Sequence, residues 1–172
     1  MIKVVNFSTF IEILKSSKQT VTHSICRLYG MLDSNQLPNV KLLIGSLHWL
    51  RIVRNSCAHN ERIYCINRAS SSGRRNSGRI LEKYFSLLPN GYQTETDQKL
   101  FDLIVYLKYY LPSNEYNRFV DTLYNMLTDL QEKIHSNAFD YIRGHMGIRN
   151  ISDLLTLKYA EKEKIDYNKF NS

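Results

Sequence analysis

The chain has 172 residues, of which 43% are hydrophobic and 23% charged, and its formal net charge is +7 at pH 7. This length fits one domain, and only 7 glycines and 3 prolines exclude a collagen-like or low-complexity chain and favour a helix-rich globular one. No apolar run reaches the roughly 18 residues of a membrane span, and residues 1–18 lack a signal-peptide pattern, so we expect a cytoplasmic protein without a membrane partner.

Apolar residues at helical spacing predict three helices in the first third of the chain. The first covers residues 7–15, and the second covers residues 21–32 with Thr20 as its expected N-cap. The third begins near Asn39, after Pro38, and continues through the sequence VKLLIGSLHWLRIVRNSCAH. This third helix is long and almost free of helix breakers.

The second half of the chain predicts two longer helices. A fourth helix over residues 96–111 ends at a proline, and Ser113 is expected to cap the next one. The fifth and longest has apolar residues three and four positions apart over residues 116–141. A stripe of this length either forms the spine of the domain or seals a helical dimer.

The remaining segments complete the predicted organisation of one domain over residues 1–172. A flexible basic loop is expected at 68–79, within the arginine-rich sequence NRASSSGRRNSGR. The sequence of residues 151–159 predicts a last short helix, and the sequence of residues 160–172 predicts a charged tail. Because no segment alternates polar and apolar residues as a strand does, we predict an all-α fold.

Positive charge is concentrated in the first half of the chain. Residues 1–91 contain 13 Lys and Arg against 4 Asp and Glu, whereas residues 92–172 contain 10 against 12. Such asymmetry indicates a polyanionic partner, and nucleic acid is the commonest one. A basic surface without a specific ligand is the alternative.

The cysteines argue against a metal or disulfide framework. Cys26, Cys57 and Cys65 are odd in number and lack the paired short spacing of structural zinc sites. We therefore expect reduced thiols and predict neither a metal nor another cofactor.

The third predicted helix places an arginine where its core stripe should end. Positions four and seven apart share a helical face, so Leu43, Leu47, Leu50 and Arg54 form one stripe. A buried guanidinium cannot lose its charge and needs an anion beside it. Glu61 could supply a carboxylate if the helix continues that far.

A neighbouring stripe of the same helix collects groups that suit a phosphodiester. His48, Asn55, His59 and Arg62 follow one another at helical spacing, with Arg51 beside them. Arginine can hold two phosphate oxygens, asparagine can orient one, and histidine can move a proton near neutral pH. The stripe therefore indicates contact with RNA or catalysis on it.

Cleavage of RNA by its own 2′-hydroxyl requires a base, an acid and a cation, and no metal. We predict that Arg54 stabilises phosphate charge, His59 transfers protons and Asn55 orients the phosphate. Arg54 and His59 would lie about 140° apart on an unbroken helix, so either the helix distorts near Asn60 or the two side chains reach a shared pocket from different angles. Since one histidine cannot easily be both base and acid, a second copy in a two-fold dimer would supply the other group.

The same residues resemble a known family. The sequence RNSCAH (54–59) resembles the HEPN signature, and LRIVRNSCAHNERIYCIN with LPNVKLL upstream resembles the Abi-like (AbiD/AbiF-type) abortive-infection proteins of that superfamily. The resemblance implies a HEPN-like helical bundle, a homodimer with active sites near its interface, and a metal-independent endoribonuclease leaving 2′,3′-cyclic phosphate ends. It also implies a toxin or phage-defence role, with a protein or RNA antitoxin as a further partner. By this resemblance, Arg54 and His59 match the family's signature pair, and Asn55 matches the polar residue beside it.

RNA is thus the predicted ligand, and further basic residues are assigned to it. We expect RNA-binding roles for six arginines: Arg51, Arg62, Arg68, Arg74, Arg75 and Arg79. Arg62 could instead pair with an acid, and the loop arginines could simply be solvated. The alternative function is a non-catalytic RNA-binding or regulatory HEPN module, and a purely structural dimerisation domain is the third possibility.

Overall fold

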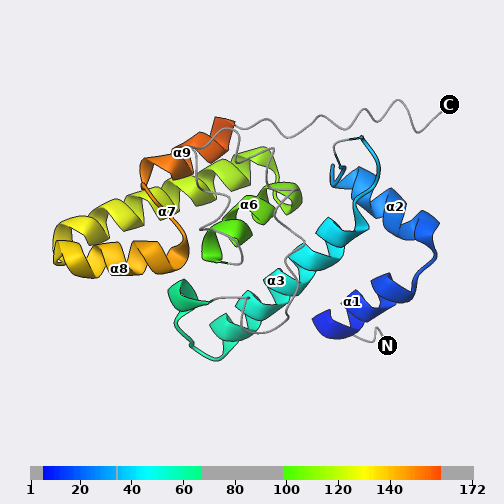
Figure 1. Cartoon of the computed structure of the whole chain (residues 1–172), viewed down its shortest axis with the longest axis horizontal. Coiled ribbons are helices and arrows are strands. Elements are labelled where there is room, and N and C mark those ends of the chain that lie inside the picture. Colours follow the sequence, from blue (N-terminus) through cyan, green and yellow to red (C-terminus); the bar gives the residue numbers. More distant parts are fainter. Residues whose placement is uncertain (1–5, 34, 67–98, 160–172) are drawn as a thin grey trace.

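The computed structural model describes residues 6–33, 35–66 and 99–159 (Figure 1). Within these ranges the chain forms seven α-helices and one 3-10 helix, and its β pairing is an isolated bridge between Leu32 and Pro38. The predicted all-α fold is confirmed for this part of the chain. The predicted basic loop at 68–79 and tail at 160–172 lie outside the described residues.

The first three predicted helices are present as α1 (Phe7–Ser16), α2 (Gln19–Leu28) and α3 (Val40–Ala58). The predicted end of the second helix at residue 32 is wrong, because the chain turns at Gly30 with a φ of 67° and Leu32 pairs with Pro38. Asn39 caps α3, because its side-chain oxygen accepts a hydrogen bond from the Leu42 backbone N at 3.0 Å. The prediction that Thr20 caps α2 is wrong. The chain becomes helical already at Gln19, so Lys18 is the N-cap and Thr20 lies in the first turn.

The helix predicted up to Pro112 is α6 (Leu100–Tyr110), and the last short helix is α9 (Ser152–Tyr159). The 3-10 helix η1 (Ile63–Cys65) follows α3. The residue expected to cap the fifth helix, Ser113, is instead its first residue. Pro112 occupies the N-cap without a side-chain hydrogen bond, as suits a ring that fixes φ.

The single helix predicted over residues 116–141 is wrong, because two helices occupy this region. They are α7 (Ser113–Lys133) and α8 (Ser136–Met146). Ile134 is extended, with φ −120° and ψ 161°, and the His135 ring accepts a hydrogen bond from the Asn137 backbone N at 3.4 Å. The apolar spacing continues across this break, so periodicity alone could not reveal it.

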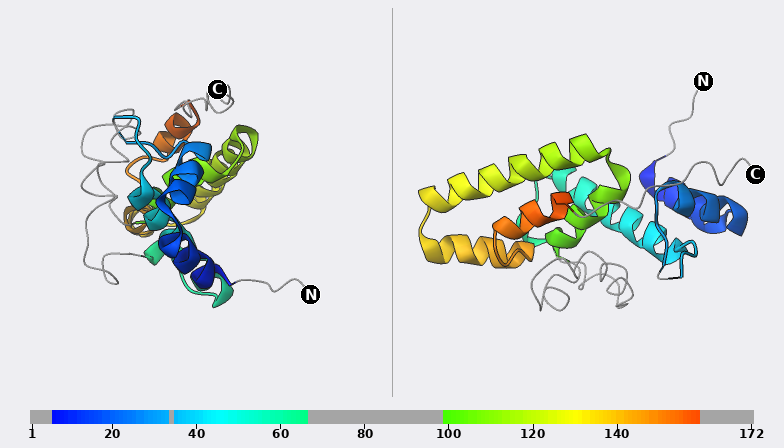
Figure 2. Two further views of the ribbon diagram at one scale, coloured as in Figure 1. Left: turned by 90° about the vertical axis from the view of Figure 1, so that its right-hand side faces the viewer. Right: turned by 90° about the horizontal axis from the view of Figure 1, so that it is seen from above.

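Figures 1 and 2 show an elongated arrangement of the helices. The pair α1 and α2 lies at one end and the α7–α8 hairpin at the other, with α3 and α6 between them. Helix α1 packs against α3, α9 packs against α7, and η1 joins the end of α3 to α8. None of the described helices combines the length and apolar character needed to cross a membrane.

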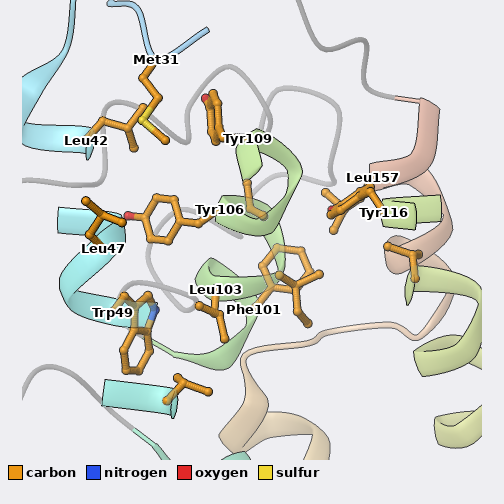
Figure 3. Close-up of a cluster of buried hydrophobic side chains, with 14 of the residues drawn as sticks. Met31, Leu42, Leu47, Trp49, Phe101, Leu103, Tyr106, Tyr109, Tyr116 and Leu157 are labelled. Carbon is orange, nitrogen blue, oxygen red and sulfur yellow. The ribbon is translucent and has the colours of Figure 1, made fainter. Parts of the chain in front are cut away.

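The core is built around α6. Eight of its 11 residues are buried, so this helix is covered on all sides. Leu47 and Trp49 of α3 lie on one side of Leu103 and Tyr106, and residues of α7 and α9 lie on the other (Figure 3). The spine of the described domain is therefore α6, and the longer α7, which the sequence indicated as a candidate spine, buries only Tyr116, Val120 and Leu127.

Lys108 is a charged residue inside this core. Its side chain is 6% exposed, donates a hydrogen bond to the Leu157 carbonyl near the end of α9, and lies 5.4 Å from the centre of the Tyr116 ring. Burial lowers the pKa of Lys108 from 10.5 to about 8. Lys108 of α6 therefore contacts both α7 and α9, whereas the desolvation of its charge is unfavourable.

We expect stability to rise with pH because of Lys108. Between the folded pKa of about 8 and the ordinary value of 10.5, the unfolded chain binds more protons than the folded one, so the free energy of unfolding increases with pH in that window. Urea unfolding should show a gain of about 1 kcal/mol from pH 7 to pH 9. The Lys108→Met variant should lack this gain, and an equal pH dependence in both proteins would contradict the assignment.

Gly147 ends α8 in a conformation that requires glycine. Its φ is +80°, and a Cβ there would lie 3.0 Å from the Lys99 Cβ. We expect Gly147→Ala to lower the free energy of unfolding by about 1–3 kcal/mol in urea denaturation. The matched control is Gly144→Ala in the same helix, where a Cβ would meet nothing within 4 Å, and this variant should be neutral or slightly stabilising.

Candidate functional site at the end of α3

The last turns of α3 bury one face and expose the other. Buried positions continue at helical spacing through Trp49, Val53 and Ser56. The prediction that Arg54 completes the core stripe is wrong, because Leu50 is only half-buried and Arg54 is exposed. Arg54 keeps the same angular position as Leu43, so no described element covers this side of the last turn.

The helix ends in a tight reversal after Ala58. His59 is the C-cap, and its backbone N donates to the Asn55 carbonyl at 3.0 Å. Asn60 has a left-handed φ of 54°, and the Glu61 backbone N donates to the Ser56 carbonyl at 2.9 Å. This is the pattern of a Schellman motif, in which asparagine can replace the usual glycine. Of the two geometries left open by the sequence, the structure therefore has the helix ending at His59 and Asn60.

Four polar side chains are exposed together along this helix end. They are Arg54, Asn55, His59 and Arg62, and the Arg54 Nη1 donates to the Asn55 Oδ1 at 3.1 Å. The possible ion pair of Arg54 with Glu61 is not formed among the described residues. Glu61 instead accepts a hydrogen bond from the Ser56 Oγ at 2.6 Å, so both guanidinium groups remain available to an anion.

The electrostatics of a helix C-terminus determine how an anion could bind here. Backbone carbonyls point outward at this end and carry a partial negative charge, so the backbone offers little to a phosphate. Cationic side chains are favourable at this position. The guanidinium groups of Arg54 and Arg62 therefore have to supply the attraction, with Asn55 and His59 as hydrogen-bonding groups.

The other predicted RNA contacts have different surroundings. Arg51 is half-buried between α3 and α1, where its Nη1 donates to the Ser8 Oγ at 3.3 Å and its buried Nε has no hydrogen-bond partner among the described residues. His48 is half-buried one turn before Arg51 and interacts with another group of the protein. The structure therefore does not bring these two residues into the exposed group. The loop arginines lie outside the described residues: Arg68, Arg74, Arg75 and Arg79.

Three residues shape this helix end: the sequence reasoning missed Ser56, named Asn60 only as a possible site of distortion, and gave Glu61 another partner. Ser56 is buried, Asn60 adopts the left-handed conformation, and Glu61 bonds to Ser56. An asparagine just beyond a long helical pattern is a recognisable stop signal and could have located the turn. Among the described residues, no group of three or more His, Cys, Asp or Glu side chains is placed to hold a metal ion.

Comparison with known proteins identifies the segment that carries this site. Residues 1–65 match the family model described as Abi-like protein. The matched segment contains α1, α2, α3 and η1, and therefore all four exposed polar residues. Comparisons with curated proteins and with solved structures found no match.

Proposed function

We propose that this chain, whose residues 1–65 match the family model described as Abi-like protein, is a metal-independent endoribonuclease of the HEPN type. Its role would be that of a toxin or a component of abortive-infection phage defence, as the family name suggests. RNA is the substrate, and an antitoxin, either protein or RNA, is a further partner. The site residues are those exposed at the end of α3.

One observation carries the proposal: Arg54, Asn55 and His59 are all exposed at the end of α3, and among the described residues no carboxylate pairs with them. A structural arginine is commonly paired with an acid, whereas the hydrogen bond of the Arg54 guanidinium within the described residues goes to the Asn55 amide. An arginine and an amide already in contact can hold two oxygens of one phosphate. This arrangement supports phosphate binding better than a purely structural role.

The proposed reaction assigns one role to each side chain. His59 removes the proton of the 2′-hydroxyl or protonates the leaving 5′-oxygen, and Arg54 stabilises the charge that develops on phosphorus. Asn55 orients a non-bridging oxygen, and Arg62 strengthens binding to the RNA backbone. The 2′-oxygen bonds to phosphorus as the P–O5′ bond breaks, which leaves a 2′,3′-cyclic phosphate and a 5′-hydroxyl.

This scheme needs a second proton-transfer group. The end of α3 contributes one histidine per chain, and in a homodimer two such ends related by a two-fold axis could supply both the acid and the base. We therefore place the active sites near a dimer interface. The competing function is an RNA-binding or regulatory module, which is favoured by the presence of a single exposed histidine and two exposed arginines at this helix end.

An assay in excess EDTA tests the proposal. Purified protein is incubated with end-labelled RNA, and we expect fragments ending in 2′,3′-cyclic phosphate. Retained but uncut RNA would favour the binding module, and cleavage that stops on chelation would contradict the metal-independent mechanism. Arg118→Ala on α7 is a matched control for loss of charge, because this exposed arginine lies on a different helix from the site.

A further inference from the structure

The turn that holds His59 is closed by two hydrogen bonds between the same two residues. The Glu61 backbone N donates to the Ser56 carbonyl at 2.9 Å, and the Ser56 Oγ donates to the Glu61 Oε2 at 2.6 Å. We call this pair of bonds the Ser56–Glu61 clasp. It encloses residues 57–60, so His59 lies inside the closed ring.

The end of α8 has the same backbone pattern but is closed by a different side-chain contact. There the Ile148 N donates to the Arg143 carbonyl at 3.1 Å, and the side chain of Ile148 is 1% exposed. A buried apolar side chain at this position is the common way to secure a Schellman motif. In α3 the equivalent residue is the exposed Glu61, and a hydrogen bond from Ser56 replaces the apolar contact.

Ser56 is suited to this role by its burial. Its side chain is 6% exposed on the core face of α3, where a hydroxyl without a partner would be costly. A carboxylate is a strong acceptor, and the short distance of 2.6 Å is typical of a hydroxyl bound to a charged oxygen. The core therefore fixes the position of Ser56, and the hydrogen bond from Ser56 to Glu61 stabilises the turn.

We propose that the Ser56–Glu61 clasp is a positioning device for His59, an inference that rests on the proposed RNA cleavage. The backbone of His59 is tied on one side to Asn55 and on the other to the left-handed Asn60. Opening the clasp releases the second constraint and lets the imidazole turn away from the phosphate bound by Arg54. Ser56 and Glu61 thus act on the reaction through His59 without touching RNA.

Three variants separate the clasp from general stability. Ser56→Ala and Glu61→Ala remove the side-chain bond of the clasp and leave its backbone bond unsupported, whereas Glu61→Gln keeps a carbonyl oxygen that can accept the Ser56 hydrogen bond. The matched control is Ser46→Ala, because Ser46 is a buried serine on the same helix whose Oγ lies 2.6 Å from the Tyr110 hydroxyl. This control loses an equally short hydrogen bond far from His59.

The first measurement is NMR on the free protein and needs no activity. In Ser56→Ala and Glu61→Ala, the Asn60 and Glu61 amides should exchange about tenfold faster, and the His59 ring signals should shift toward those of a freely rotating histidine. Glu61→Gln should retain most of the protection, and Ser46→Ala should leave these signals unchanged. Unchanged His59 signals in Ser56→Ala would overturn the inference.

The second measurement is the kinetics of RNA cleavage. Loss of the clasp should lower kcat by about ten- to a hundredfold with KM nearly unchanged, because alignment is lost while phosphate binding remains. Glu61→Gln should recover most of kcat. If the wild-type protein cleaves RNA and Ser56→Ala cleaves it equally well, the clasp has no positioning role. If the wild-type protein does not cleave RNA, the proposed function fails instead, and the NMR measurement still decides whether the clasp orients His59.

Discussion

Replacing His59 with alanine is expected to reduce RNA cleavage by about 10²–10⁴-fold, the range typical for loss of a proton-transfer group. The loss should appear mainly in kcat, because the RNA would still be held by the arginines. His59 is exposed at the C-cap of α3, so its removal should leave the folded state nearly unaffected. Thermal unfolding of the variant should therefore resemble that of the wild-type protein.

Replacing Arg54 should have a different kinetic signature. Its guanidinium would contact phosphate both in the bound substrate and in the transition state, so Arg54→Ala should raise KM and also lower kcat, by about 10²-fold or more. Arg54→Lys should recover little, since an ammonium cannot replace the bidentate guanidinium. Because one phosphate contact is lost, the affinity for RNA should also depend less steeply on salt concentration.

Rates from initial velocities with a defined RNA oligonucleotide would check both expectations. Arg118→Ala and His23→Ala are controls that remove the same residue types from α7 and α2. Full activity of His59→Ala would contradict its role in proton transfer. Equal loss of activity in the controls would instead point to a general effect of charge or stability.

Helix positions were largely predictable from sequence because burial on one face imposes a period that is visible in the residues. The sequence also placed the start of α3 near Asn39, which the structure shows to be its N-cap. The break at Ile134 was not predictable, because apolar spacing continues through it and the two helices then fold back on each other. Which helix becomes the core was equally hidden, since it depends on how α3, α7 and α9 surround α6.

The polar residues of the site could be selected from sequence, whereas their environment could not. Helical angles placed Arg54 on the core stripe of α3, which implied burial for a side chain that is exposed and bonded to Asn55. Exposure depends on which neighbouring elements extend to the last turn, and this is a property of the tertiary structure. Likewise, the partner of Glu61 was expected to be an arginine, but the reversal at Asn60 brings the carboxylate to Ser56.

Trp49 anchors the helix that carries the site. It is the single tryptophan of the chain, is fully buried, and packs beside α6 (Figure 3). Its indole Nε1 is also buried, and it makes no hydrogen bond to the described residues. The ring therefore contributes a large apolar contact while carrying the cost of one unsatisfied donor.

These two opposing contributions predict different effects for two substitutions. Trp49→Ala should lower the free energy of unfolding by about 3–5 kcal/mol, because it removes the apolar contact and leaves a cavity. Trp49→Phe should cost less than half as much, since phenylalanine fills most of the space and eliminates a buried donor whose desolvation costs about 1–3 kcal/mol. Urea unfolding followed by circular dichroism measures both, with the slope m expected to stay constant. An equal loss in the two variants would mean that the indole N–H has a hydrogen-bond partner in solution.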